Sequence, residues 1–358
     1  MNLLRNYRIE KRSDIGVPAQ VLSALVALAV ALLVTAILVT VAGGDWKDAF
    51  VSLYGGAFGD KGAILESLVR STPLILTGLA AAIAFRGKIW NIGAEGQFFA
   101  GAIGSYWAYL TFEGLPTVLL WMLIFVAGCI TGGLFGLLAG VLKAYFNVDE
   151  IITTVMTNYI VTYMLALILS GPWKEPGSVY RHTPQVPDYI RLPILASGSR
   201  LNLGFLLALL AALLFYYIIN KTPLGFEIRA LGSNPVASKF KGISVSRTVI
   251  MTLLISGAVA GLSGAIELFG SQYRIRMDLS TGYGFTGIIV ALLGGLNPLA
   301  IIPAGIFFGG LINGSIRMQI ITKVPTALIS AVQAIILLFL LASQAITRYR
   351  IRRIRDVE

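Results

Sequence analysis

The side chains of this sequence that could do chemistry lie inside apolar stretches. One stripe of polar residues recurs at four-residue spacing, which places its members on one face of a helix: Glu150, Thr154, Asn158 and Thr162. Polar groups are costly in lipid, so such a stripe faces the interior of a helix bundle. A largely neutral hydrogen-bonding stripe suits a sugar hydroxyl or the edge of a nucleobase. The alternative is that these residues join helices, which we favour for Thr154 and Thr162 and leave open for Asn158.

A second polar group, Asn91, Glu95 and Gln97, opens another apolar stretch. We expect Asn91 to cap the helix that follows, with Glu95 in its first turn, where the helix dipole favours an anion. Capping accounts for Asn91 but requires neither Gln97 nor the small residues Gly93 and Gly96. This leaves a role in binding or passage open.

Several kinds of chemistry are excluded by the residues themselves. The sequence has no phosphate-binding loop of the form GxxxxGK[ST], and the stretch from Gly55 to Gly62 comes nearest without matching it. The single histidine (His182) and single cysteine (Cys129) cannot form a metal cluster, a Ser-His-Asp set or a disulfide. We therefore predict no enzyme, no metal site, no bound cofactor and no ATP hydrolysis by this chain itself.

A basic loop between two apolar stretches carries the most informative local pattern, from Thr222 to Ile243. Gly232 is predicted to end one helical turn, and Asn234 to cap the next, with Pro235 at its first position. A short helix over 235–241 would then present Phe240 between two lysines. The alternative is an ordinary basic loop that only sets topology.

Apolar stretches of about twenty residues, each able to cross a bilayer as a helix, recur along the whole chain. Of its 358 residues, 56% are hydrophobic and 13% charged. We predict an all-α, polytopic membrane protein with ten spans, at 18–42, 63–85, 92–111, 117–142, 149–170, 201–219, 248–269, 280–295, 298–315 and 325–346. The eighth and ninth are short and glycine-rich, which indicates a broken or re-entrant helix. Glu66 and Arg70, one turn apart on the second span, are expected to pair.

Charge predicts the orientation. The net charge is +11, and the basic residues lie in short clusters between apolar stretches. This placement indicates topology signals and argues against nucleic-acid binding. Both termini are predicted to be cytoplasmic. The domains are then a cytoplasmic segment (1–17), a single transmembrane domain (18–346) with a proline-rich outer loop (171–200) and a cytoplasmic loop (220–247), and a basic cytoplasmic tail (347–358).

The two halves of the chain are weakly alike around Gly133–Gly140 and Gly305–Gly314. Internal duplication and chance similarity between membrane helices both explain this.

Four segments together carry a family resemblance. The cytoplasmic loop resembles the coupling segment of permeases in the branched-chain amino acid, sugar and nucleoside class of ABC importers, through Gly225, Arg229, Ala230, Gly232, Asn234, Pro235, Gly242 and Ile243. The segments 88–97, 148–159 and 282–294 are similar to the nucleoside (guanosine and purine nucleoside) branch. Arg274, Arg276 and Asp278 depart from the family trend, because they make an outer stretch unusually charged.

The resemblance implies roles and partners. The loop would be a coupling helix in a groove of a partner ATPase, which would use the ATP and Mg²⁺. The translocation path would include Asn91, Glu95, Gln97, Asn158, Tyr283 and Phe285, while the glycine-rich 282–287 either lines a cavity or packs closely. Further expected partners are a related or identical second permease, an extracytoplasmic substrate-binding lipoprotein and membrane lipid. The location would be the cytoplasmic membrane of a prokaryote.

Other functions remain as alternatives. A ribose or other sugar permease, or a branched-chain amino acid permease, would share the fold. An ion-coupled secondary transporter needs buried carboxylates in mid-span, and Glu95 and Glu267 are the only candidates. A membrane-embedded enzyme is disfavoured because it would lack a nucleophile, metal and base.

Overall fold

The computed structural model describes residues 7–11 and 17–323, position 325, and the short stretches 331–332, 334–335, 338–339, 342–343 and 349–353. The chain divides into two compact units, one formed by 57–313 and the other by 1–56 with 314–358. Most of the predicted tenth span and most of the basic tail lie outside the described residues.

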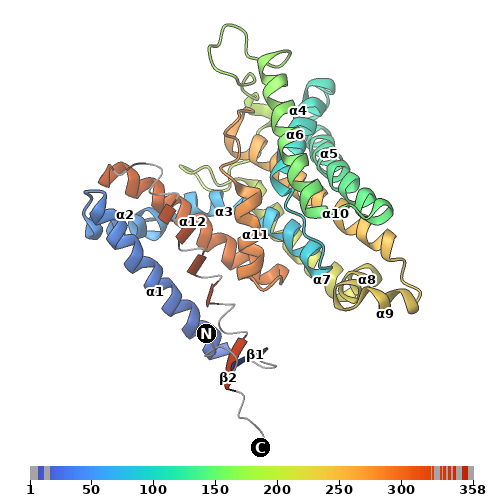
Figure 1. The fold of residues 1–358 in the computed structure, drawn as a ribbon. Coiled ribbons are helices and arrows are strands. Elements are labelled where there is room, and N and C mark those ends of the chain that lie inside the picture. The colour runs from blue at the N-terminus through green and yellow to red at the C-terminus, as the bar shows by residue number, and fades with distance from the viewer. Residues whose placement is uncertain are drawn as a thin grey trace, which may run out of the picture. The chain divides into compact units, whose positions relative to one another are not determined.

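The larger unit is a bundle of helices (Figure 1). Its elements are α3 (Lys61–Arg86), α4 (Ala94–Thr111), α5 (Thr117–Phe146), α6 (Glu150–Ser170), α7 (Leu203–Lys221), α8 (Pro223–Ser233), α9 (Pro235–Phe240), α10 (Val245–Glu267), α11 (Tyr283–Leu293) and the start of α12 (Pro298–Thr322). A 3₁₀ turn, η1 (Asp188–Ile190), interrupts the outer loop, and a π-helical turn, η2 (Leu268–Gln272), continues α10.

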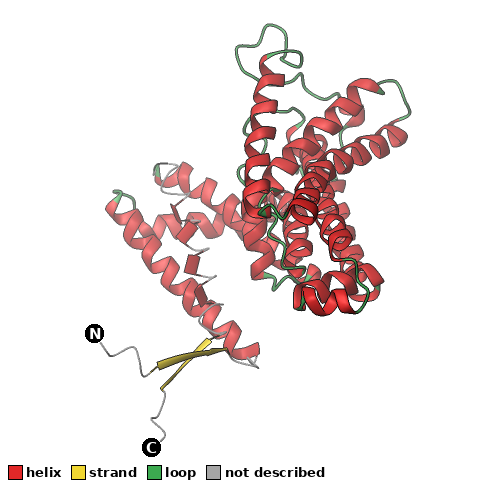
Figure 2. Ribbon diagram, turned by 45° about the vertical axis from the view of Figure 1, so that its right-hand side comes forward, coloured by secondary structure: helices red, strands yellow, loops and turns green. Residues whose placement is uncertain are grey.

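The smaller unit contains α1 (Val17–Val41), most of α2 (Trp46–Phe58), the end of α12 and two short strands. The strands, β1 (Tyr7–Lys11) and β2 (Tyr349–Arg353), pair antiparallel with Tyr7 opposite Arg353 (Figure 2). The sequence did not predict these two strands, whereas the helical character of the chain is confirmed. Their pairing places the two terminal segments beside each other.

Six described helices are long and apolar enough to cross a membrane: α3, α5, α6, α7, α10 with its π-helical turn, and α12. The predicted count of ten is not confirmed. The predicted eighth span shrinks to α11, whose 11 residues rise about 16 Å against a hydrocarbon thickness of about 30 Å. The ninth, predicted as short, is part of the 25-residue α12. The sequence also predicted no helix where α2 lies.

The centre of the larger unit is the contact between α5 and α10. Glycines on both helices bring the two backbones together, and a Cβ added to Gly261 would lie 2.2 Å from the carbonyl oxygen of Gly128. Small residues that recur every fourth position permit this approach between membrane helices. Because α10 also packs against α3 and α4, it is the element around which the bundle is built.

Local sequence explains where several helices begin and end. Asp60 accepts a hydrogen bond from the Ala63 amide (2.8 Å) and caps α3, and Asp149 does the same for α6 through Ile151 (2.8 Å). Asn147 ends α5 in the left-handed region (φ +51°). Between residues 171 and 200 the only described helix is the three-residue η1, as the prolines predicted.

Candidate functional site

The predicted coupling segment folds as two short helices. Thr222 caps α8 by accepting from the Gly225 amide (3.2 Å), and Asn234 caps α9 by accepting from the Ala237 amide (3.0 Å). Pro235 is the first residue of α9. The prediction of a short helix capped by Asn234 is therefore confirmed. Gly232 does not end α8, which continues to Ser233.

α9 exposes two large apolar side chains. Phe240 is 88% exposed and Val236 is 65% exposed. Beside them lies a groove of about 980 Å³, lined largely by apolar residues: Ala144, Asn147, Pro235, Val236, Lys239, Phe240, Ile243, Ser244, Val245 and Ser246. Exposed apolar side chains of this size, rimmed by basic ones, mark a surface for contact with another protein or with the membrane.

α8 fixes this surface to the bundle. A Cβ added to Gly232 would lie 2.1 Å from the carbonyl oxygen of Arg86, so α8 and the end of α3 touch through their backbones. Leu231 belongs to a buried apolar cluster with Ile89, Ala139, Val249 and Leu253. α8 therefore connects α9 to the helices of the core.

Polar contacts extend this connection. Glu227 of α8 accepts from the Thr248 hydroxyl of α10 (3.1 Å), and Arg86 donates to the carbonyl oxygen of Leu296 (2.8 Å), ahead of α12. Arg229 buries one terminal nitrogen that has no hydrogen-bond partner among the described residues, and Ala230 is half-buried. Gly242, at φ +82°, turns the chain from α9 toward α10.

The predicted path residues around α4 form a buried hydrogen-bond network. Asn91 donates to Gln97 (2.8 Å) and to Ser256 (2.8 Å), and Ser256 donates to the carbonyl oxygen of Ala80 (2.6 Å). The prediction that Asn91 is the N-cap of α4 was wrong. That position belongs to Gly93, whose amide donates to Asn91 (2.9 Å). The network joins α3, α4 and α10.

Two further path candidates join helices through backbone amides. Glu95, in the first turn of α4, accepts from the Gly284 amide of α11 (2.7 Å). Asn158 of α6 accepts from the Gly96 amide (2.7 Å) and donates to the carbonyl oxygen of Ile92 (3.0 Å). These contacts fix the starts of α4 and α11 beside each other.

The last two path candidates differ in exposure. Tyr283 is buried, with its ring centroid 6.0 Å from that of Phe98, whereas Phe285 is 48% exposed. The structure thus brings Glu95 and the start of α11 together and leaves Phe285 facing outward from α11. Assignment of the six residues to a translocation path stays a prediction.

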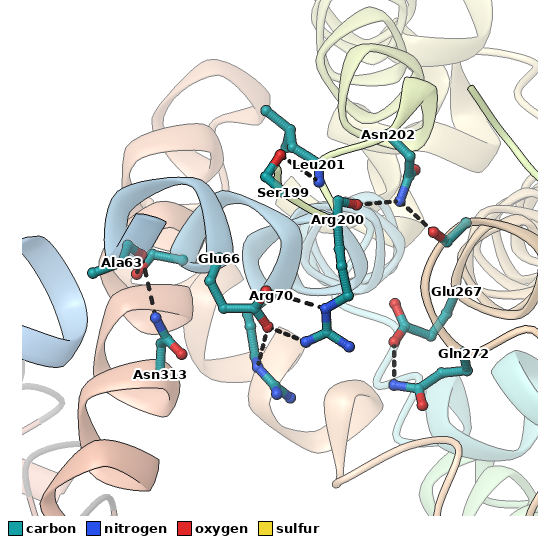
Figure 3. A network of polar contacts seen from close by, with 12 residues as sticks. Ala63, Glu66, Arg70, Ser199, Arg200, Leu201, Asn202, Glu267, Gln272 and Asn313 are labelled. Atoms are coloured by element: carbon teal, nitrogen blue, oxygen red, sulfur yellow. Dashed lines mark hydrogen bonds and ion pairs between the residues drawn. The ribbon is translucent and has the colours of Figure 1, made fainter. Parts of the chain in front are cut away.

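Sequence reasoning missed the charged cluster in Figure 3. Glu66 pairs with Arg70 (3.5 Å), as predicted, but it also accepts two hydrogen bonds from Arg200, 134 residues away. Glu267 is buried close by and accepts from Gln272 (3.0 Å). The ion pairs of Glu66 join α3 to the outer loop through Arg200, and Glu267 places a carboxyl group of α10 beside them.

Asn202 completes this junction. Its amide nitrogen donates to the carbonyl oxygen of Gly270 (2.7 Å) in the π-helical turn, and its oxygen accepts from the Gly204 amide (2.9 Å) at the start of α7. A π-helical turn leaves backbone groups without their usual helical partner. Asn202 supplies a hydrogen-bond partner for one such group, the carbonyl oxygen of Gly270, and thereby anchors the loop to α10.

The family model described as branched-chain amino acid transport system, permease component, matches residues 63–341. The chain belongs to this permease family. It is 38% identical to the guanosine ABC transporter permease protein NupP of Bacillus subtilis (strain 168), over 90% of this chain and 93% of that protein. It is 34% identical to the nucleoside ABC transporter permease protein NupB of Lactococcus lactis subsp. cremoris (strain MG1363), over 90% of each. It is also 34% identical to the glucose ABC transporter permease protein TsgB13 of Haloferax volcanii, over 86% of this chain and 83% of that one.

These similarities fix the class of the protein. The chain is a permease subunit of an ABC importer and a multi-pass protein of the prokaryotic cytoplasmic membrane. It is a transport component.

Proposed function

We propose that this permease carries nucleosides, with purine nucleosides such as guanosine preferred, while a partner ATPase supplies the energy. The observation that carries the proposal is similarity over nine-tenths of the chain to permeases named for guanosine and for nucleosides. The second candidate is a sugar, because the glucose permease is as similar as the second nucleoside permease. A nucleoside contains a sugar, so one path lined by hydrogen-bonding groups suits either.

The exposed α9 is the proposed contact with the ATPase. Phe240 and Val236 would enter a groove of that subunit, and Lys239 and Lys241 would meet its surface charges. This assignment makes the loop 220–247 cytoplasmic and the loop 171–200 extracytoplasmic. The contact of Gly232 with the end of α3 supports the idea that closure of the ATPase pair moves the core helices rather than bending a loose loop.

The path is proposed to run beside the starts of α4 and α11. Phe285 would face it, because this side chain is half exposed within an otherwise packed region. Asn91, Glu95, Gln97, Asn158 and Tyr283 would shape its wall by fixing the ends of α4, α6 and α11. A second permease, related or identical, would supply the opposite wall, and an extracytoplasmic lipoprotein would deliver substrate.

Uptake competition tests the substrate. In cells whose uptake of radiolabelled guanosine depends on this chain, excess unlabelled adenosine or inosine should abolish uptake, while ribose, glucose and leucine should leave it unchanged. Competition by glucose alone would favour the second candidate. Loss of uptake on adding an ionophore, with ATP held constant, would contradict the ATP-driven mechanism.

A further inference from the structure

A basic groove lies on the face that the proposed function assigns to the outside. Its volume is about 560 Å³, and its lining comes from two segments far apart in the sequence: Tyr180, Arg181, His182, Arg274, Arg276, Met277 and Asp278. It includes two of the arginines that stand out as unusual in the sequence. Neither the path nor the coupling surface uses them.

Main-chain contacts hold the floor of the groove in place. His182 and Arg276 face each other as an antiparallel bridge. The Thr183 amide donates to the carbonyl oxygen of Ile275 (3.1 Å), and the Ile275 amide donates back to the Thr183 hydroxyl (3.0 Å). The two segments are therefore preorganised, and a partner would not have to order them on binding.

The arginines are only partly neutralised. Arg274 lies 3.8 Å from Glu175, and Arg276 lies 3.3 Å from Asp278, with side chains 28% and 41% exposed. Arg181 is exposed and forms no ion pair with any residue that the structure describes. Three arginines thus face two carboxylates, those of Glu175 and Asp278, which leaves a positive surface.

The rim has the residue types of a protein interface. Val179 is 90% exposed, Tyr180 is 76% exposed and Met277 is 39% exposed. Tyr, Met and Arg are enriched in protein interfaces, whereas a surface that only meets solvent seldom gathers large apolar side chains around arginines. The combination indicates a protein partner rather than a small anion.

We propose that this groove receives an acidic side chain of the substrate-binding receptor, with the rim packing around it. The inference rests on the proposed function, which supplies such a receptor and places this face outside. The receptor would present at least one Asp or Glu to Arg181 and Arg276. Opposite charges would speed its approach and fix its orientation on the permease.

Receptor binding tests the proposal. The assembled transporter in lipid nanodiscs would be titrated with the purified receptor of the same transporter at low and at high salt. Arg181→Glu should weaken the Kd by about tenfold or more, as for a charged residue at the centre of an interface. High salt should weaken receptor binding to Arg181→Glu less than it weakens receptor binding to the unchanged transporter. Arg181→Lys should keep most of the affinity.

The control is Lys61→Glu, a charge reversal at an exposed position at the start of α3, outside the groove. It should bind receptor like the unchanged transporter. A hexaglutamate peptide should compete with the receptor, and a hexalysine peptide should not. Recovery of Arg181→Glu as an assembled complex by gel filtration shows that it folds.

The outcomes separate the two claims. Equal receptor affinity for Arg181→Glu, Lys61→Glu and the unchanged transporter would overturn the groove assignment and leave the proposed function standing. A receptor that does not bind the unchanged transporter at all, or uptake that proceeds without any receptor, would overturn the proposed function and the groove assignment together.

Discussion

Replacement of Gly232 by alanine should disconnect the coupling surface from the bundle. The added Cβ would lie 2.1 Å from the carbonyl oxygen of Arg86 and 3.1 Å from its carbonyl carbon, both backbone atoms that cannot rotate away. Forcing an extra carbon into a packed contact costs about 1–3 kcal/mol. At about 1.4 kcal/mol per tenfold change, the equilibrium constant for correct seating of α8 should fall by roughly 5-fold to 150-fold.

The assay is substrate uptake and receptor-stimulated ATP hydrolysis by the assembled transporter in proteoliposomes. Gly232→Ala should reduce uptake below that of the unchanged transporter, while the ATPase should still be present in the complex because α9 itself is unchanged. Ser233→Ala is the matched control. Ser233 is exposed and donates only to the carbonyl oxygen of Arg229 (2.9 Å) within its own helix, so its loss should leave uptake near normal. Equal uptake by the two variants would refute the claim that α8 transmits motion through its contact with α3.

Three further predictions follow from single contacts. Asn234→Ala should remove the cap of α9, at a cost of about 1 kcal/mol, and lower stimulated ATP hydrolysis. Asn234→Asp keeps a capping oxygen and should retain stimulated ATP hydrolysis. Loss of stimulated hydrolysis in both variants would point to a direct contact of the amide instead. Glu95→Gln keeps an acceptor for the Gly284 amide and should preserve uptake. Glu95→Ala leaves that buried amide unpaired, at a cost of about 1–3 kcal/mol, and should reduce uptake. Loss of uptake in Glu95→Gln would show that the charge itself is required. Asn202→Asp keeps the cap of α7 but loses the hydrogen bond to Gly270. It should therefore lower the melting temperature of the complex almost as much as Asn202→Ala. A normal melting temperature for Asn202→Asp would contradict a stabilising role for that bond.

Features set by neighbouring residues could be predicted from the sequence. The cap at Asn234, with proline after it, depends on residues within one turn, and so does the pair of Glu66 with Arg70. The proline-rich outer loop could be predicted for the same reason, since each proline excludes regular helix by its own ring.

Features that depend on tertiary contact could not be predicted. The partner of Glu95 is the amide of Gly284, 189 residues away, and no local pattern names it. Likewise, Arg200 reaches Glu66 only because the outer loop folds back over α3. The length of α11 was overestimated because its apolar sequence continues through residues that form a turn, with Leu296 at φ +60°.

For the polar stripe in α6, contacts that sequence cannot supply support the helix-joining explanation at Thr154 but add nothing for Thr162, whose bond stays within α6. Thr154 and Thr162 donate to backbone carbonyl oxygens one turn earlier in their own helix, at 2.6 and 2.8 Å. Thr154 also accepts from the Ile92 amide (3.2 Å), ahead of α4, so it joins α6 to another part of the bundle. Glu150 pairs with Lys143 of α5 (2.7 Å), which ties the start of α6 to the end of α5.

Labelling from the two sides of the membrane tests the central claim, that α9 is a cytoplasmic surface engaged by the ATPase. Cys129 is the only cysteine, so Cys129→Ser gives a background in which Lys239→Cys and Tyr180→Cys can each be labelled alone. A membrane-impermeant maleimide should label Tyr180→Cys in intact cells. It should reach Lys239→Cys only in inside-out vesicles stripped of the ATPase, with protection when the ATPase is restored. Labelling of Lys239→Cys in intact cells, or no protection by the ATPase, would contradict the account.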